Sequence, residues 1–198
     1  MKLRFLAAAT FCTLSLSACV APTGPVEVTR FHAADTAPLG RGAIAIEPAP
    51  GIDGTSLEFR SYAAAVSRQL ALLGYSEQVA AGSISQIATV RLSRQTYHPE
   101  RSGSPVSVGV GGSTGSYGSG LGVGIGLNLS PRPADQVETN LAVTIKDRVS
   151  GAALWEGRAS FTVSAKSPLA STQLGAAKIA EALFAGFPGQ SGETIQVK

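Results

Sequence analysis

The sequence predicts an α+β domain of two layers, in which a mainly antiparallel sheet carries two helices packed on one face, together with a glycine-rich β-hairpin. Three observations predict this fold class. Several segments alternate apolar and polar residues, as half-buried strands do. Two segments repeat apolar residues at the spacing of one helix face, and such faces need a sheet to cover. A further stretch alternates branched aliphatic residues with glycine, which favours a hairpin.

The amino terminus is predicted to be a secretory signal peptide that covers residues 1–18. Lys2 and Arg4 supply its positive end, and a short apolar run over residues 5–16 follows. That run is shorter than the about 20 apolar residues that a membrane-spanning helix needs. Leu16-Ser17-Ala18-Cys19 is similar to the bacterial lipobox, at which the peptidase cuts before a lipidated cysteine. The alternative is a plain signal peptide with an incidental cysteine.

The lipobox resemblance implies cleavage between Ala18 and Cys19, with a diacylglycerol and an N-acyl chain attached to Cys19. A thiolate is the readiest side-chain nucleophile for such an alkyl transfer, and several chains on one residue suffice for stable anchoring. Val20 stands where lipoproteins retained at the inner membrane carry aspartate, so the resemblance implies the periplasmic face of the outer membrane. Residues 19–26 then form a lipidated tether that contains two prolines.

Residues 27–198 have the length of one ordinary domain and include a glycine-rich insert at 103–130. Two of the 16 Lys and Arg lie in the signal peptide, which leaves 14 against 13 Asp and Glu in the mature protein. With so little net charge and no basic stripe, nucleic acid is excluded as a partner class. Cys12 is lost with the signal peptide and Cys19 carries lipid, so the domain has no thiol for a disulfide, a nucleophile or a metal site.

The first elements of the domain are two short strands and a helix. Residues 27–32 and 42–47 alternate apolar and polar side chains, which predicts strands. Residues 55–73 predict a helix, because the apolar residues on one face recur at helical spacing. That face comprises Phe59, Tyr62, Ala63, Val66, Leu70 and Leu73. Thr55-Ser56-Leu57-Glu58 fits a capping box at its start, and Gly74 supplies the left-handed residue that ends it.

Three longer strands are predicted next, at residues 86–97, 136–149 and 153–165. The last two form a hairpin across Ser150-Gly151, and each strand alternates so that one face is buried. Apolar residues of the expected buried faces are Ala88, Val90, Leu92, Leu141, Val143, Ile145, Trp155, Ala159, Phe161 and Val163.

A second helix is predicted to open at Ser167-Pro168, because proline is tolerated in a first helical turn. Its apolar stripe comprises Leu169, Ala176, Ile179, Ala180, Leu183 and Phe187. Gly175 weakens the prediction for the first turns, and Pro188-Gly189 ends the helix. The tail, residues 192–198, is expected either to fray or to add a short edge strand.

The glycine-rich stretch over residues 103–126 has two alternating arms and a flexible tip expected at 112–120. One face is branched aliphatic and the other is almost bare backbone. The bare face is a candidate partner surface made of Gly109, Gly111, Gly122, Gly124 and Gly126.

Three interpretations of this hairpin are open. The first is that its aliphatic face joins the core, and we favour it because antiparallel sheets normally bury one face. The second is that the smooth face or a strand edge docks a partner or a second copy, since glycine-rich strands are weakly specified in register. The third is insertion into the membrane, although a lone hairpin leaves open edges in lipid.

The residues offer no catalytic constellation. Gly111-Gly112-Ser113-Thr114-Gly115 matches the nucleophile-elbow pattern, but a strand instead of a helix follows it, and no histidine occurs after His98. His32 and His98 are the only histidines, and nothing in the sequence places carboxylates beside them for a metal. We therefore expect no enzyme, no metal site and no cofactor other than the lipid on Cys19.

Five segments carry a resemblance to a known family. They are Val28-Thr29-Arg30-Phe31, Leu70-Ala71-Leu72-Leu73-Gly74-Tyr75, the insert from Gly103 to Gly126, Leu154-Trp155-Glu156-Gly157-Arg158-Ala159 and Ala182-Leu183-Phe184-Ala185-Gly186-Phe187-Pro188. With these segments the chain resembles the bacterial lipoproteins grouped as domain of unknown function 4136. The resemblance implies a compact α+β lipoprotein of the cell envelope and supplies no reaction, substrate or catalytic residue.

These observations together predict a non-catalytic envelope protein that binds a partner or supports an assembly from the periplasmic face of the outer membrane. Its expected partners are the membrane, through the lipid, and an envelope protein or a second copy of the chain. The alternative is a small-molecule or glycan-binding lipoprotein that uses a cleft beside the glycine-rich hairpin.

Overall fold

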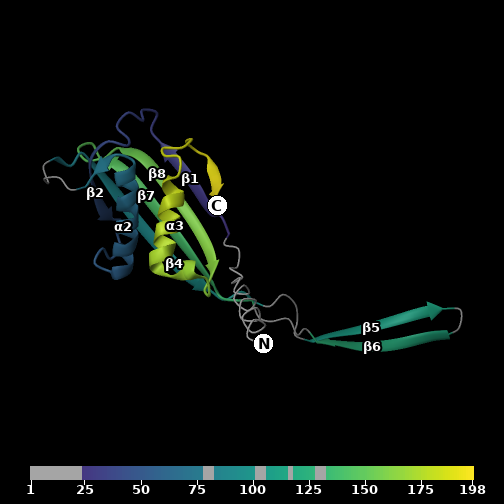
Figure 1. Ribbon diagram of the computed structural model, residues 1–198. Helices are drawn as coiled ribbons and strands as arrows, with labels where there is room; N and C mark the ends of the chain where they lie inside the picture. The colour runs from purple at the N-terminus through teal and green to yellow at the C-terminus, as the bar shows by residue number, and fades with distance from the viewer. Residues whose placement is uncertain (1–23, 78–82, 101–105, 116–117, 128–132) are drawn as a thin grey trace, which may run out of the picture.

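The computed structural model describes residues 24–77, 83–100, 106–115, 118–127 and 133–198 (Figure 1). Its main sheet has seven strands in the order β3-β2-β4-β7-β8-β1-β9. The strands are β1 (Val26–His32), β2 (Gly42–Pro48), β3 (Tyr75–Ser76), β4 (Gln86–Tyr97), β7 (Gln136–Asp147), β8 (Ala153–Ser164) and β9 (Thr194–Val197). Neighbouring strands are antiparallel, apart from β2, which runs parallel to both β3 and β4. The predicted α+β class with a mainly antiparallel sheet is confirmed.

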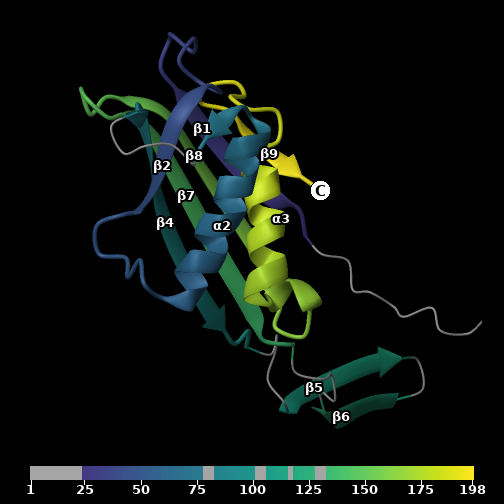
Figure 2. The same cartoon turned by 60° about the vertical axis from the view of Figure 1, so that its left-hand side comes forward.

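Two helices cover one face of this sheet, as Figures 1 and 2 show. They are α2 (Leu57–Leu72) and α3 (Thr172–Phe184), which lie side by side. The alternation of the strands explains the arrangement, because the apolar side of each long strand turns toward the helices. Ala88, Val90, Val143, Ile145, Trp155 and Phe161 are all buried beneath them. Among the described residues no helix packs on the opposite face of the sheet, and the side chains on that face are mostly polar.

The start of α2 differs from the predicted capping box. Ser56 is the N-cap, and its hydroxyl accepts a hydrogen bond from the Phe59 N–H at 3.1 Å. Thr55 instead donates its N–H and its hydroxyl to Asp53 Oδ1, at 2.9 and 2.7 Å. Thr55 and Ser56 both offer a hydroxyl group for the N-cap position. The Thr55 hydroxyl is used in the turn with Asp53, so Ser56 becomes the cap. These bonds also lower the pKa of the Asp53 carboxyl.

Gly74 ends α2 as predicted. Its φ is +104°, in the range that favours glycine, and a Cβ built there would lie only 2.5 Å from the Gly40 carbonyl oxygen. This close approach lets the chain turn at once into β3 beside β2.

The second predicted helix divides into two pieces. A 3₁₀ turn, η2 (Pro168–Ala170), precedes α3, and Ser171 lies between them. Gly175 permits this division, because a Cβ there would come within 2.7 Å of the Leu169 carbonyl oxygen. After α3 the chain returns as β9, which pairs with β1 and places Ile195 against Val28. The edge-strand expectation for the tail is therefore correct.

The glycine-rich hairpin forms a separate sheet of two strands, β5 (Val106–Gly115) and β6 (Gly118–Leu127). It stands away from the main sheet in both views (Figures 1 and 2). Our favoured prediction that its aliphatic face joins the core is wrong, since the hairpin forms its own sheet away from the main sheet and its Ile125 side chain is 70% exposed. The tip is also shorter than expected, because pairing continues to Gly115 opposite Gly118.

Candidate functional site

The face of the main sheet opposite α2 and α3, which we call the outer face, holds two arginines. They lie on β4 and β8, the two strands that flank β7. Arg91 of β4 pairs with Ala142 of β7, and Ala142 pairs in turn with Arg158 of β8. The three residues therefore form one row across the sheet, with the small Ala142 side chain between two long cationic ones. Strands lie about 4.8 Å apart, so the two arginine Cα atoms are about 10 Å apart.

Two shallow hollows overlie this row. One has a volume of about 420 Å³ and is lined by Ala49, Pro50, Thr89, Arg91, Ala142, Thr144, Lys146, Glu156 and Arg158. The other, of about 160 Å³, is lined by Arg91, Ser93, Asn140, Leu141, Ala142, Arg158 and Ala159. Ala142 of the middle strand lines both hollows and contributes only a methyl group between the longer Arg91 and Arg158 side chains.

Charges in the larger hollow are unequal. Three lining residues are cationic and one, Glu156, is anionic. The Glu156 carboxylate accepts two hydrogen bonds from Arg158, from Nε at 3.0 Å and from Nη2 at 2.5 Å. Arg91 is exposed, and among the residues that the structure describes no hydrogen-bond or ion-pair partner of its guanidinium is found. The outer face thus presents a donor-rich, cationic hollow that can accept an anion.

The inward residues of the same strand explain the most specific segment of the family resemblance. Trp155 is only 1% exposed, and its ring stacks on Phe184 with centroids 5.3 Å apart. Its indole N–H donates to the Pro188 carbonyl at 2.9 Å. Gly157 faces the same ring, since a Cβ there would lie 2.2 Å from a Trp155 ring carbon. Trp155 and Gly157 therefore stabilise the fold by packing against α3. Glu156 and Arg158 alternate with them along the strand and face outward.

A buried arginine secures the far end of α3. Arg30 is 5% exposed, and its guanidinium donates to the carbonyls of Leu183 and Ala182, both at 3.1 Å. These carbonyls belong to the last helical turn, where a cation is favoured by the helix dipole. Burial lowers the pKa of Arg30, and the nearby Glu193 carboxylate opposes that shift. All of this assigns Arg30 to the fold and not to a ligand site.

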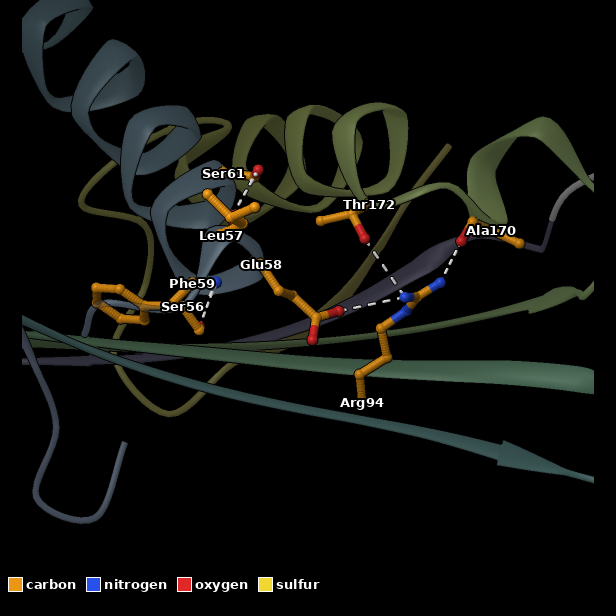
Figure 3. A network of polar contacts seen from close by, with 8 residues as sticks. All are labelled: Ser56, Leu57, Glu58, Phe59, Ser61, Arg94, Ala170 and Thr172. Atoms are coloured by element: carbon orange, nitrogen blue, oxygen red, sulfur yellow. Dashed lines mark hydrogen bonds and ion pairs between the residues drawn. The ribbon is translucent and has the colours of Figure 1, made fainter. Parts of the chain in front are cut away.

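A second arginine joins the starts of the two helices (Figure 3). Arg94 Nη1 binds Glu58 Oε1 of α2 at 3.2 Å and Thr172 Oγ1 of α3 at 3.4 Å, and Nη2 donates to the Ala170 carbonyl. The Glu58 carboxylate, which the sequence predicts in a capping box, therefore binds Arg94 and links α2 to β4 instead. This contact could not be predicted from the sequence, because its partners are far apart along the chain.

The histidines do not assemble a reactive group. His32 Nδ1 lies 2.8 Å from the Ala33 carbonyl oxygen, and His98 Nδ1 lies 2.7 Å from Asp135 Oδ1. Within the described ranges, no three His, Cys, Asp or Glu side chains gather closely enough to hold a metal ion. Ser113, from the elbow-like pattern, lies within strand β5 and not at a turn between a strand and a helix.

The predicted partner surface is placed by the register of the hairpin. Gly109 pairs with Gly124, Gly111 with Gly122, and Ser107 with Gly126. Directly paired residues of an antiparallel ladder share a face, so all five predicted glycines lie on one face. The intervening pairs join aliphatic residues: Val106 with Leu127, Val108 with Ile125 and Val110 with Val123. Ile125 is 70% exposed, in keeping with a hairpin that stands apart from the core.

The predicted cleavage and lipidation residues, Ala18 and Cys19, lie outside the described residues. Over the part of the chain that the structure describes, no helix has the length and apolar character needed to span a bilayer.

Comparison with known proteins identifies the family. The model of a family described as a domain of unknown function, DUF4136, matches residues 44–189. This chain belongs to the DUF4136 family. The match runs from β2 to the segment after α3, so it covers the Trp155 strand and the helices. It leaves out β1, which contains the segment Val28-Thr29-Arg30-Phe31.

Similar proteins add little about activity. An uncharacterized protein of Zymomonas mobilis is 29% identical over an alignment of 217 positions. The aligned region covers 89% of this DUF4136 chain and 81% of that protein. A PDZ domain protein from Parabacteroides distasonis has a TM-score of 0.44 at 9% identity; the match covers 88% of this chain and 39% of that one. The PelC dodecamer from Paraburkholderia phytofirmans has a TM-score of 0.39 at 12% identity, covering 80% of this chain and 96% of its own.

The sequence contained a signal for part of the outer-face site. Alternation placed Arg91 and Arg158 on the polar sides of their strands. It could not bring them together, because their shared row depends on β7 lying between β4 and β8.

Proposed function

We propose that this DUF4136 protein is a lipid-anchored protein of the cell envelope that acts by binding a partner or supporting an assembly, and not by catalysis. In this proposal Cys19 carries the acyl chains and holds the domain at the periplasmic face of the outer membrane. The signal-like amino terminus and the lipobox resemblance of Leu16-Ser17-Ala18-Cys19 support this localisation.

The hairpin is the observation that carries the binding role. β5 and β6 pair only with each other among the described strands, so each keeps one edge of backbone N–H and C=O groups without a strand partner. Such edges accept an added strand from another chain. A two-stranded hairpin is marginally stable alone, and it gains most from that addition. The glycine face adds a flat surface on which a second backbone can lie closely.

The partner role can be tested by crosslinking in intact cells followed by mass spectrometry. Gly122→Val and Gly124→Val together place two branched side chains on the smooth face without touching the core sheet. We expect these variants to lose a discrete crosslinked product while keeping the melting temperature. Thr162→Val is the matched control, because it adds an exposed valine to β8 of the main sheet. A partner list unchanged by the glycine variants contradicts the proposal.

The anchor is tested separately with Cys19→Ala. We expect this variant to be uncleaved or soluble and to incorporate no labelled fatty acid, whereas the parent chain is labelled and fractionates with outer membranes. Equal labelling of the two proteins would refute the assignment of Cys19.

A further inference from the structure

The outer face of the main sheet carries a site that the proposed assembly role does not use. We propose that the hollow over Ala142 binds a small organic anion through a carboxylate or phosphate group held between Arg91 and Arg158. The inference is independent of the hairpin and of the lipid anchor.

The shape of the row favours this occupant. Ala142 contributes only a methyl group between the two arginines, so a ligand group can approach the middle strand closely. Two arginines about 10 Å apart at Cα have side chains long enough for both guanidinium groups to reach one group above Ala142. The planar fork of each guanidinium matches the oxygens of a carboxylate or phosphate.

Charge also favours an anion. Arg158 is already held in place by Glu156 through Nε and Nη2, which leaves Nη1 as a further donor on an oriented group. Arg91 has no ion-pair or hydrogen-bond partner among the described residues and is available to a ligand. Lys146 supplies a third positive charge to the same hollow, and Thr89 and Thr144 supply hydroxyl groups. One carboxylate does not neutralise three cations.

The size of the site favours a free small molecule over a polymer or a bilayer. The larger hollow, at about 420 Å³, lies within the range of small-ligand sites. A nucleic acid would need a basic stripe, but the outward residues of β4, β7 and β8 include only three cations, and the mature chain carries 14 basic against 13 acidic residues.

The test is isothermal titration calorimetry on the full chain purified in detergent, with inorganic phosphate and with citrate as probes. Sodium chloride at matched ionic strength serves as the reference titration. We expect saturable binding of at least one probe beyond the chloride response. Arg91→Gln and Arg158→Gln should each weaken that binding by about tenfold or more, because each removes a charge-assisted contact. Preference for phosphate or citrate identifies the anion class.

Arg60→Gln is the matched control, since it removes an exposed arginine from α2 on the opposite side of the sheet. It should leave probe binding unchanged, and melting curves should show that all three variants are folded. The proposal is overturned if neither probe binds beyond chloride, or if the Arg91 and Arg158 variants bind as the control does. It is also overturned if the chain binds phosphatidylglycerol vesicles through these arginines while ignoring both probes, because the occupant would then be a membrane.

Discussion

Replacing Gly157 by alanine should destabilise the domain, because no space for a methyl group exists between β8 and α3. The new Cβ would lie 2.2 Å from Trp155 Cη2 and 2.8 Å from both Trp155 Cζ2 and Leu183 Cδ1. Carbon atoms in van der Waals contact are about 3.5–4.0 Å apart, so either the ring or the helix must move. The ring cannot shift freely, since its N–H is bound to Pro188 and its face stacks on Phe184.

Overpacking of this kind costs about 1–3 kcal/mol, and the fixed indole places Gly157→Ala near the upper end, at about 2–3 kcal/mol. For a domain of this size that corresponds to a fall in melting temperature of roughly 4–12 °C. Gly24→Ala is the control, because a Cβ at this exposed position would meet no atom closer than 3.9 Å. Its melting temperature should stay within about 1 °C of the parent.

The cause can be isolated in a Trp155→Phe background. Phenylalanine lacks the two ring carbons that the new methyl group would meet, so the added cost of alanine at position 157 should fall by about 1 kcal/mol or more. Unfolding is followed by circular dichroism for all four proteins of the cycle. A loss below about 2 °C for the single variant, or equal costs in both backgrounds, would refute the packing argument.

Three further predictions concern the cap, a turn carboxylate and the hairpin. Ser56→Ala should lower the free energy of unfolding by about 1 kcal/mol through loss of the α2 cap, whereas Thr55→Ala should cost less, which denaturant titration can distinguish. Hydrogen bonds from Ser150 and Val149 lower the pKa of the Asp147 carboxyl. The carboxylate therefore stabilises the fold above its unfolded pKa of about 4, and this stabilisation is lost as the pH falls through the lowered folded pKa. The difference in unfolding free energy between the parent and Asp147→Ala should shrink below about pH 4. Deletion of residues 106–127 should leave the melting temperature of the domain within about 3 °C of the parent, since β5 and β6 form a sheet of their own that stands away from the main sheet. A large fall in the melting temperature would mean that the hairpin supports the core.

Much of the fold follows from local alternation. The bounds of β4 agree with the predicted 86–97, and the β7–β8 hairpin turns where Ser150-Gly151 predicted it. These elements were predictable because one buried face imposes a period of two on each strand. The capping box was wrongly predicted because Thr55 and Ser56 offer the same hydroxyl group. Local hydrogen bonds to Asp53 take up the Thr55 hydroxyl, and the tertiary contact with Arg94 takes up the Glu58 carboxylate.

The placement of the hairpin could not be predicted for a different reason. Its pairing is local and follows from the alternation, but whether its aliphatic face packs on the core depends on space that α2 and α3 already occupy. The outer-face site depends on strand order as well. Arg91 and Arg158 are separated by the whole insert and by β7, and only the order β4-β7-β8 brings them into one row.

Strand β8 shows how one stretch of sequence serves both the fold and the site. Trp155 and Gly157 point toward α3 and are fixed by packing, whereas Glu156 and Arg158 point to the outer face, where the ion pair orients a cation beside the hollow. Because successive residues face opposite sides, packing on α3 holds the strand and thereby sets the height and spacing of the charged row. The rigid core therefore preorganises the outer face, so substitutions at 155 and 157 act first on stability and those at 156 and 158 act first on binding.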